Sequence, residues 1–161
     1  MVEGGRRGLI RRRRGTQDSP PLRGTARRRY GGCEIGHIPR IPPMKITQAF
    51  TFEAAHRLPN VPETHRCHRM HGHSYRVELT VAGPVDPHTG WVIDFYDIES
   101  IFGPLLARLD HHCLNEIEGL ENPTAENIAA WIWQRLRPDL PGLARVRIAE
   151  TPMSWAEYDG E

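Results

Sequence analysis

The segment from Cys67 to His73, CHRMHGH, places one cysteine and three histidines within seven residues. Thiolates and neutral imidazoles are side chains that bind zinc, and histidine also exchanges protons near neutral pH. His71 and His73 flank Gly72, so in an extended segment their rings project from the same face. Two histidines at this spacing supply two of the three protein ligands of a catalytic zinc ion, whose fourth position is left open.

The third ligand must come from another segment. His56 is the best candidate, because it ends the alternating segment FEAAH, which could pair beside the His71 segment. His65 and His68 are further candidates that spacing does not exclude. The alternative interpretation is an exposed, histidine-rich loop without a metal. A zinc finger is disfavoured, since the paired cysteines that it needs are absent.

Three further positions carry groups suited to proton transfer or hydrogen bonding. Cys67 lies four residues before His71, and a thiol near a bound cation is a usable base or nucleophile, although a lone cysteine can also be an inert apolar side chain. In LDHHCLN, Asp110 can orient a histidine such as His111 as a proton carrier, unless these are ordinary residues of a helix end. Glu150 ends an alternating segment, where its carboxylate either accepts paired N–H donors or faces solvent.

The hydrophobic pattern predicts the elements that position these groups. Alternation indicates strands, the spacing i, i+3, i+4, i+7 indicates helices, and Thr124 is placed to cap the second helix. The strands are predicted over 45–56, 74–83, 91–95, 143–151 and 154–160, and the helices over 98–109 and 124–138. The strand at 91–95 is expected to form a hairpin with 74–83. This order predicts an α+β domain with helices packed on one face of an antiparallel sheet.

Charge divides the chain into two parts. Residues 1–43 carry eleven arginines and three acids, a net charge of +8, whereas residues 44–161 carry ten basic and seventeen acidic groups, a net charge of −7. The first part has little apolar surface to bury, so it is predicted to be a disordered Arg-rich extension of the domain at 44–161. It could be a nucleic-acid-binding tail, a transit peptide or, as we favour, sequence upstream of a translation start at Met44.

Composition also narrows the class and compartment of the protein. Three widely spaced cysteines do not indicate a disulfide framework and are typical of a reducing compartment. There is no apolar run of about 18 residues or more and no secretory leader, so we expect a cytoplasmic protein that does not act in the membrane.

Several segments, taken in order, resemble the 6-pyruvoyltetrahydropterin synthase and 6-carboxytetrahydropterin synthase family. They are FEAAHRL, CHRMHGHSY, GWVIDF, LDHHCLN, ENPTAE and ETP, and they run from about residue 46 to residue 152. The resemblance implies a subunit of the tunnelling fold, with an antiparallel four-stranded sheet and two helices packed on one face. It also implies a homo-hexamer built from two trimers, with active sites between subunits.

The resemblance also implies roles for the candidate residues. These are the Zn²⁺ ligands His56, His71 and His73, the general base Cys67, the proton relay of Asp110 and His111, and the pterin-binding residues Glu150, Thr124 and Glu126. Glu150 is sometimes grouped with the relay. The cysteine, three residues and then His-Gly-His form the spacing of the carboxytetrahydropterin branch of this family.

The implied reaction is that of a carbon–carbon lyase in queuosine biosynthesis. It converts 7,8-dihydroneopterin triphosphate to 6-carboxy-5,6,7,8-tetrahydropterin, with loss of acetaldehyde and triphosphate. Arg57, Arg66 and Arg69 are either triphosphate contacts or solvated side chains. One alternative is the pyruvoyl activity, which eliminates triphosphate but keeps the carbon side chain. A remote alternative is a zinc-dependent nucleic-acid-binding module, which the net charge of −7 on residues 44–161 disfavours.

Overall fold

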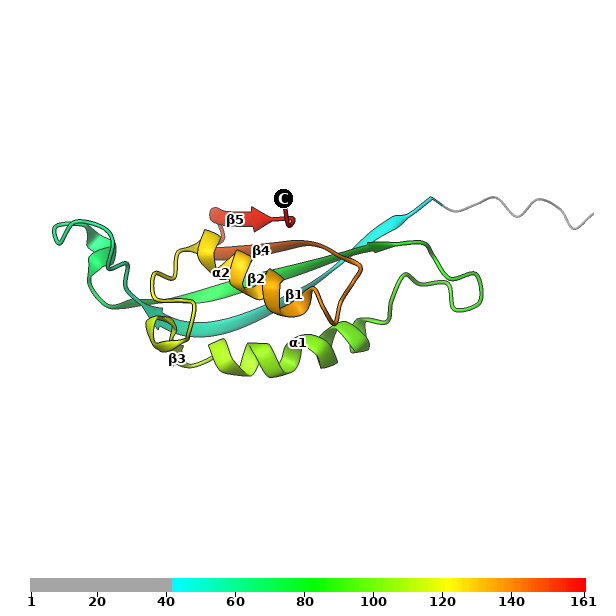
Figure 1. Cartoon of the computed structure of the whole chain (residues 1–161), viewed down its shortest axis with the longest axis horizontal. Helices are drawn as coiled ribbons and strands as arrows, with labels where there is room; N and C mark the ends of the chain where they lie inside the picture. Colours follow the sequence, from blue (N-terminus) through cyan, green and yellow to red (C-terminus); the bar gives the residue numbers. More distant parts are fainter. Residues whose placement is uncertain (1–41) are drawn as a thin grey trace, which may run out of the picture. The chain divides into compact units, whose positions relative to one another are not determined.

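A long antiparallel ribbon of β1 (Met44–His56) and β2 (His71–Gly83) carries the candidate histidines. The computed structural model describes residues 42–161, and Figure 1 shows this ribbon running through it. The two strands pair along their whole length, with His56 opposite His71 at the end where the connecting loop begins. Every second residue from Phe52 to His56 is buried, as expected for a sheet with one covered face.

The sheet is mixed and has five strands in the order β3-β1-β2-β4-β5. The short β3 pairs parallel to β1, and the other neighbours are antiparallel. The remaining elements are α1 (Phe95–Leu109), β3 (His112–Cys113), α2 (Ala125–Leu136), β4 (Leu143–Thr151) and β5 (Ser154–Tyr158), with 3-10 turns at Arg66–His68 and Leu114–Glu116.

Both helices pack on the same face of the sheet and close one hydrophobic core. Ile98, Phe102 and Leu109 of α1 and Ile132 of α2 are fully buried in that core, together with Tyr75 of β2. The Thr124 hydroxyl accepts a hydrogen bond from the backbone N–H of Asn127 and so caps α2. The predicted α+β class, with two helices on one face, is confirmed.

Two predictions of local structure are wrong. Residues 91–93 form bends instead of a strand, and α1 begins at Phe95, because the Asp94 carboxylate accepts a hydrogen bond from the Tyr96 N–H and caps the helix there. The place beside β2 is taken by β4 instead. Four antiparallel strands were expected; the fifth, β3, arises where HHCLN of the expected polar connection pairs in parallel with Ala54 and Ala55.

None of the helices within residues 42–161 is long and apolar enough to cross a membrane. The Arg-rich extension predicted at 1–43 lies almost entirely outside the described residues, so its disorder and the translation start at Met44 stay predictions.

Candidate functional site

Three histidines converge at the end of the β1–β2 ribbon. His56 lies opposite His71, and His73 pairs with Ala54, so the three rings project from the covered face of neighbouring strands. The ring centroids of His56 and His71 are 4.5 Å apart, and the His73 ring lies 5.1 and 5.0 Å from these two. Each ring offers a nitrogen within 4.8 Å of the others. This cluster, the histidine triad, could hold a metal ion.

Backbone carbonyls fix the tautomers of two triad rings. The His56 Nδ1–H donates to the Pro123 carbonyl oxygen at 2.8 Å, and the His71 Nδ1–H donates to the Arg69 carbonyl oxygen at 2.8 Å. In the neutral rings both Nε2 atoms therefore carry lone pairs, and these atoms face each other at 3.1 Å. Two facing lone pairs repel unless a cation lies between them. Carbonyl acceptors of this kind are also what orients metal-binding imidazoles in proteins.

Burial favours the neutral, metal-binding form of His56 and His73. The pKa of His56, which is 1% exposed, is lowered by burial, although its hydrogen bond to Pro123 acts in the opposite direction. Burial likewise lowers the pKa of His73. The Tyr75 ring lies 5.8 Å from the His56 ring and 5.5 Å from the His73 ring, and it stacks on Phe52 at 4.8 Å. The triad therefore rests on a rigid aromatic pair.

Gly72 lets β1 and β2 approach closely within the triad. A Cβ atom at this position would lie 3.2 Å from the Ala54 carbonyl oxygen, closer than ordinary van der Waals contact. The ladder that sets the spacing of His71 and His73 would have to shift to accept a side chain there.

Cys67 lies in the 3-10 turn of the loop between β1 and β2, partly buried, with a free thiol. Its carbonyl accepts from the Leu58 N–H at 2.8 Å, and its own N–H donates to His65 Nδ1 at 3.1 Å, so the turn is tied to the start of the loop. Among the described residues, the metal-binding group consists of the triad alone and includes none of Cys67, His65 and His68.

Asp110 and His111 form a hydrogen-bonded pair beside β1. His111 Nδ1 lies 2.9 Å from Asp110 Oδ1, and the backbone N–H of Glu53 donates to the same oxygen at 2.9 Å. These hydrogen bonds, that of Glu53 first, lower the pKa of Asp110. His111 has a φ of 59°, unusual for a residue other than glycine, and its N–H donates to the Glu53 carbonyl at 2.6 Å. The backbone of one residue thus holds both members of the pair.

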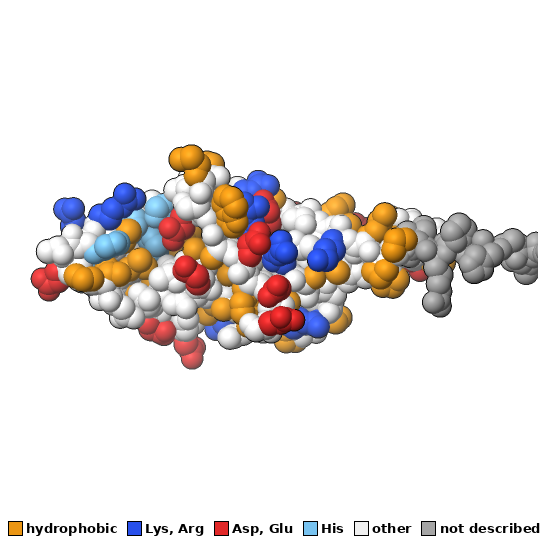
Figure 2. All heavy atoms as spheres, turned by 90° about the horizontal axis from the view of Figure 1, so that it is seen from above, with side chains coloured by type: hydrophobic (Ala, Val, Ile, Leu, Met, Phe, Trp, Pro, Cys, Tyr) orange, Lys and Arg blue, Asp and Glu red, His pale blue; other side chains and the backbone are white. Residues whose placement is uncertain are grey.

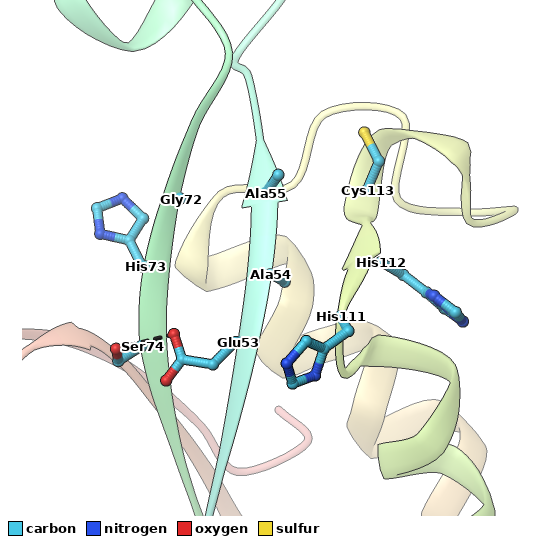
Figure 3. Close-up of a pocket in the computed structure, with 9 residues that line it drawn as sticks. All are labelled: Glu53, Ala54, Ala55, Gly72, His73, Ser74, His111, His112 and Cys113. Carbon is cyan, nitrogen blue, oxygen red and sulfur yellow. Dashed lines mark hydrogen bonds between the residues drawn. The ribbon is translucent and has the colours of Figure 1, made fainter.

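The Asp110–His111 pair and the His73 ring lie on different sides of the ribbon. A hollow of about 510 Å³ is bordered by both His73 and His111, together with Glu53, Ser74 and Cys113 among others. Figure 3 shows the His73 ring on the side of β2 that faces away from β1, whereas His111 lies beyond β1. The His111 side chain is 77% exposed. Within one chain both strands of the ribbon therefore lie between the His73 ring and the Asp110–His111 pair.

The three residues expected to bind the pterin share a second hollow. Thr124, Glu126 and Glu150 border a cavity of about 320 Å³, which Leu58 and Trp155 also line. The charge of the Glu150 carboxylate opposes the lowering of the His56 and His73 pKa values by burial, so this side of the hollow lies near the triad. The Thr124 hydroxyl already accepts the capping hydrogen bond of α2, which leaves its O–H free to donate.

Sequence reasoning missed three features of this region. Pro123 and Glu53 form these hydrogen bonds through main-chain atoms, so the identity of their side chains does not reveal them. Tyr75 could have been found, since period-two alternation places it on the face of His71 and His73. Its hydroxyl is buried without a hydrogen-bond partner in the described part of the chain, and burial raises its pKa.

Comparison with known proteins identifies the family. The profile of the 6-pyruvoyl tetrahydropterin synthase family matches residues 45–161. The chain belongs to this family. A 6-carboxy-5,6,7,8-tetrahydropterin synthase of Synechocystis is 43% identical over 119 residues, covering 70% of this chain and 91% of the relative. A dihydroneopterin monophosphate aldolase of Pyrococcus furiosus is 34% identical over 103 residues, covering 64% and 83%.

A solved structure supports the same assignment. The 6-pyruvoyl tetrahydropterin synthase of Caenorhabditis elegans superposes with a TM-score of 0.70 at 28% identity, covering 76% of this chain and 99% of that protein. The tunnelling fold predicted from the sequence is therefore confirmed, and the chain is a member of a family of pterin-converting enzymes.

Proposed function

We propose that this protein is a zinc-dependent 6-carboxytetrahydropterin synthase of queuosine biosynthesis. Its substrates are 7,8-dihydroneopterin triphosphate and one molecule of water, and its products are 6-carboxy-5,6,7,8-tetrahydropterin, acetaldehyde and triphosphate. The observation that carries the proposal is the histidine triad, with two imidazole lone pairs 3.1 Å apart, in a chain 43% identical to a carboxytetrahydropterin synthase. Within residues 42–161, Cys67 and Cys113 are free thiols, as is typical of proteins in the reducing environment of the cytoplasm, where we propose that this protein acts.

His56, His71 and His73 are the proposed metal ligands. Three neutral imidazoles, with no further protein ligand among residues 42–161, match a catalytic zinc site with one open position. When bound, Zn²⁺ supplies Lewis-acid polarisation of the substrate's side-chain hydroxyl groups. The Pro123 and Arg69 carbonyls hold the His56 and His71 rings so that their Nε2 atoms face each other.

Cys67 and the Asp110–His111 pair are the proposed proton-transfer groups. Cys67 takes a proton from the substrate side chain as a general base. The Asp110 carboxylate holds the His111 Nδ1 proton, which leaves His111 Nε2 as the atom that gains and loses a proton. The low pKa of Asp110 keeps the carboxylate charged, so it stabilises the imidazolium form of His111.

Glu150 is the proposed anchor of the pterin ring. A carboxylate accepts two parallel N–H bonds, as the amino-pyrimidine edge of a pterin offers. Glu126 and the donating O–H of Thr124 line the same hollow and complete the proposed pterin pocket.

The active site is proposed to form between subunits of a homo-hexamer built from two trimers. In one chain the His73 ring and the Asp110–His111 pair lie on opposite sides of the β1–β2 ribbon, and the His111 ring is largely exposed. A neighbouring subunit that packs against this ribbon would bring its own pair to the triad.

Product analysis tests the proposal. The purified protein is incubated with 7,8-dihydroneopterin triphosphate; the pterin product is identified by mass spectrometry, acetaldehyde is assayed, and zinc is measured in the same sample. Carboxytetrahydropterin with equimolar acetaldehyde is expected. A 6-pyruvoyl product without acetaldehyde would establish the pyruvoyl activity instead, which the likeness to the Caenorhabditis elegans enzyme favours. Absence of both products would refute the proposal.

A further inference from the structure

The loop between β1 and β2 carries a cluster of unpaired positive charge beside the triad. Residues 57–70 contain three arginines, Arg57, Arg66 and Arg69, and one acid, Glu63. All three arginines are exposed, and in the part of the chain that the structure describes none of them forms an ion pair. Figure 2 shows Lys and Arg side chains gathered beside the histidines at this end of the molecule.

Two of these arginines lie in the part of the loop next to the triad. Arg66 begins the 3-10 turn, and the Arg69 carbonyl that follows this turn accepts a hydrogen bond from the ring of a triad member, His71, at 2.8 Å. Arg69 has extended backbone angles, φ −81° and ψ 149°, and lies two residues before His71, so alternation favours a side chain on the face of the triad. Arg57 directly follows His56, and its N–H and carbonyl form hydrogen bonds with the Asn115 side chain, which tie it to the turn at Leu114–Glu116.

Charge of opposite sign lies in the hollow proposed for the pterin. Glu126 and Glu150 border the hollow proposed for the pterin, and Leu58 is the residue of the loop that reaches this hollow. The site therefore has an acidic side that suits N–H donors and a basic side that suits an anion. Guanidinium groups bind phosphate oxygens through paired N–H bonds.

We propose that Arg66 and Arg69 bind the triphosphate group of the substrate and set the preference for three phosphates over one. The proposal rests on the proposed function, and it gives the substrate a direction: pterin toward Glu150, side-chain hydroxyls at the triad, triphosphate on the loop. Phosphate number is a meaningful variable here, since a relative of this chain is named for a monophosphate substrate.

The test compares Arg66→Gln, Arg69→Gln and the double variant with Lys45→Gln. Lys45 is exposed and lies near the far end of β1, so its replacement removes one charge without touching the loop. Each arginine replacement is expected to lower kcat/KM for dihydroneopterin triphosphate about tenfold, the effect of one charge-assisted hydrogen bond. Binding of unphosphorylated 7,8-dihydroneopterin and the zinc content should match wild type. Equal losses with both pterins, or no loss beyond that of Lys45→Gln, would overturn the proposal.

Calorimetry with inorganic tripolyphosphate separates this inference from the proposed function. The probe is titrated into the zinc-loaded wild-type and double-variant proteins at two salt concentrations, with no turnover required. Weaker binding by the double variant and a smaller dependence on salt support the arginine site even if dihydroneopterin triphosphate proves not to be a substrate. Equal affinities of the two proteins would refute it even if the proposed reaction is found.

Discussion

Mixing two inactive variants should restore activity if the active site forms between subunits. His71→Ala removes a triad ligand, and His111→Asn removes the proton carrier with a residue that tolerates the φ of 59°. Within one chain, His73 and His112 both pair with Ala54, so two strand spacings, about 10 Å, separate their backbones. Proton transfer needs contact at about 3 Å. A neighbour's pair is therefore expected to serve each triad.

The size of the restored activity follows from counting. In a random one-to-one assembly, half of the chains keep an intact triad and half of their neighbours keep an intact His111. About one quarter of the sites then have both, so the mixture should show about one quarter of wild-type activity. The two chains are co-expressed with different tags, purified through both tags, and assayed for pterin product.

A control assembly makes the result decisive. Wild-type chains co-assembled with His71→Ala/His111→Asn chains should also give about one quarter of full activity if neighbours share a site. If each chain used its own pair, the first assembly would show no activity above either variant alone and the control would show about half. That pattern would refute the inference that the Asp110–His111 pair of a neighbouring subunit serves each triad.

Four further predictions concern the site and its support. Cys67→Ala should abolish turnover while zinc stays near one per subunit, because the thiol is outside the metal-binding group; product assay and metal analysis check both. His71→Ala should lose zinc as well as activity, and full zinc retention would contradict its place as a ligand. Phe52→Ala should lower the free energy of unfolding by about 3–5 kcal/mol, since the ring is only 2% exposed in the core; denaturant unfolding measures this. The metal-free protein should lose stability as pH falls below about 6.5, because His56 and His73 have lowered pKa values and the unfolded chain binds protons there that the folded chain does not; a flat pH profile of metal-free unfolding would contradict this.

The triad could be predicted from sequence because its geometry is local. Gly72 and the period of two place His71 and His73 on one face, and the register of a single antiparallel pair brings His56 opposite them. Neither step depends on the rest of the chain. The relevant physical rule is alternation along a strand, which short sequence segments express directly.

The features that could not be predicted depend on distant main-chain contacts. The Asp110–His111 pair is held by the backbone of Glu53, 57 residues away from Asp110 in sequence. That contact follows from the parallel pairing of β3, whose two residues are too few to give a pattern. In WVIDF, a short apolar run suited a strand as well as the approach to a helix, and the capping carboxylate of Asp94 decided between them.

The loop at 57–70 joins two strands whose ends are already fixed by thirteen paired residues on each side. Its other residues can therefore vary with little strain on the ligand geometry, provided that Cys67 and the Arg69 carbonyl that orients the His71 ring keep their places. Exchange of this one segment between relatives is a way to change which anion is bound while the histidine triad stays the same. Substrate range and metal affinity become separately adjustable properties, which is useful both for natural divergence and for laboratory redesign.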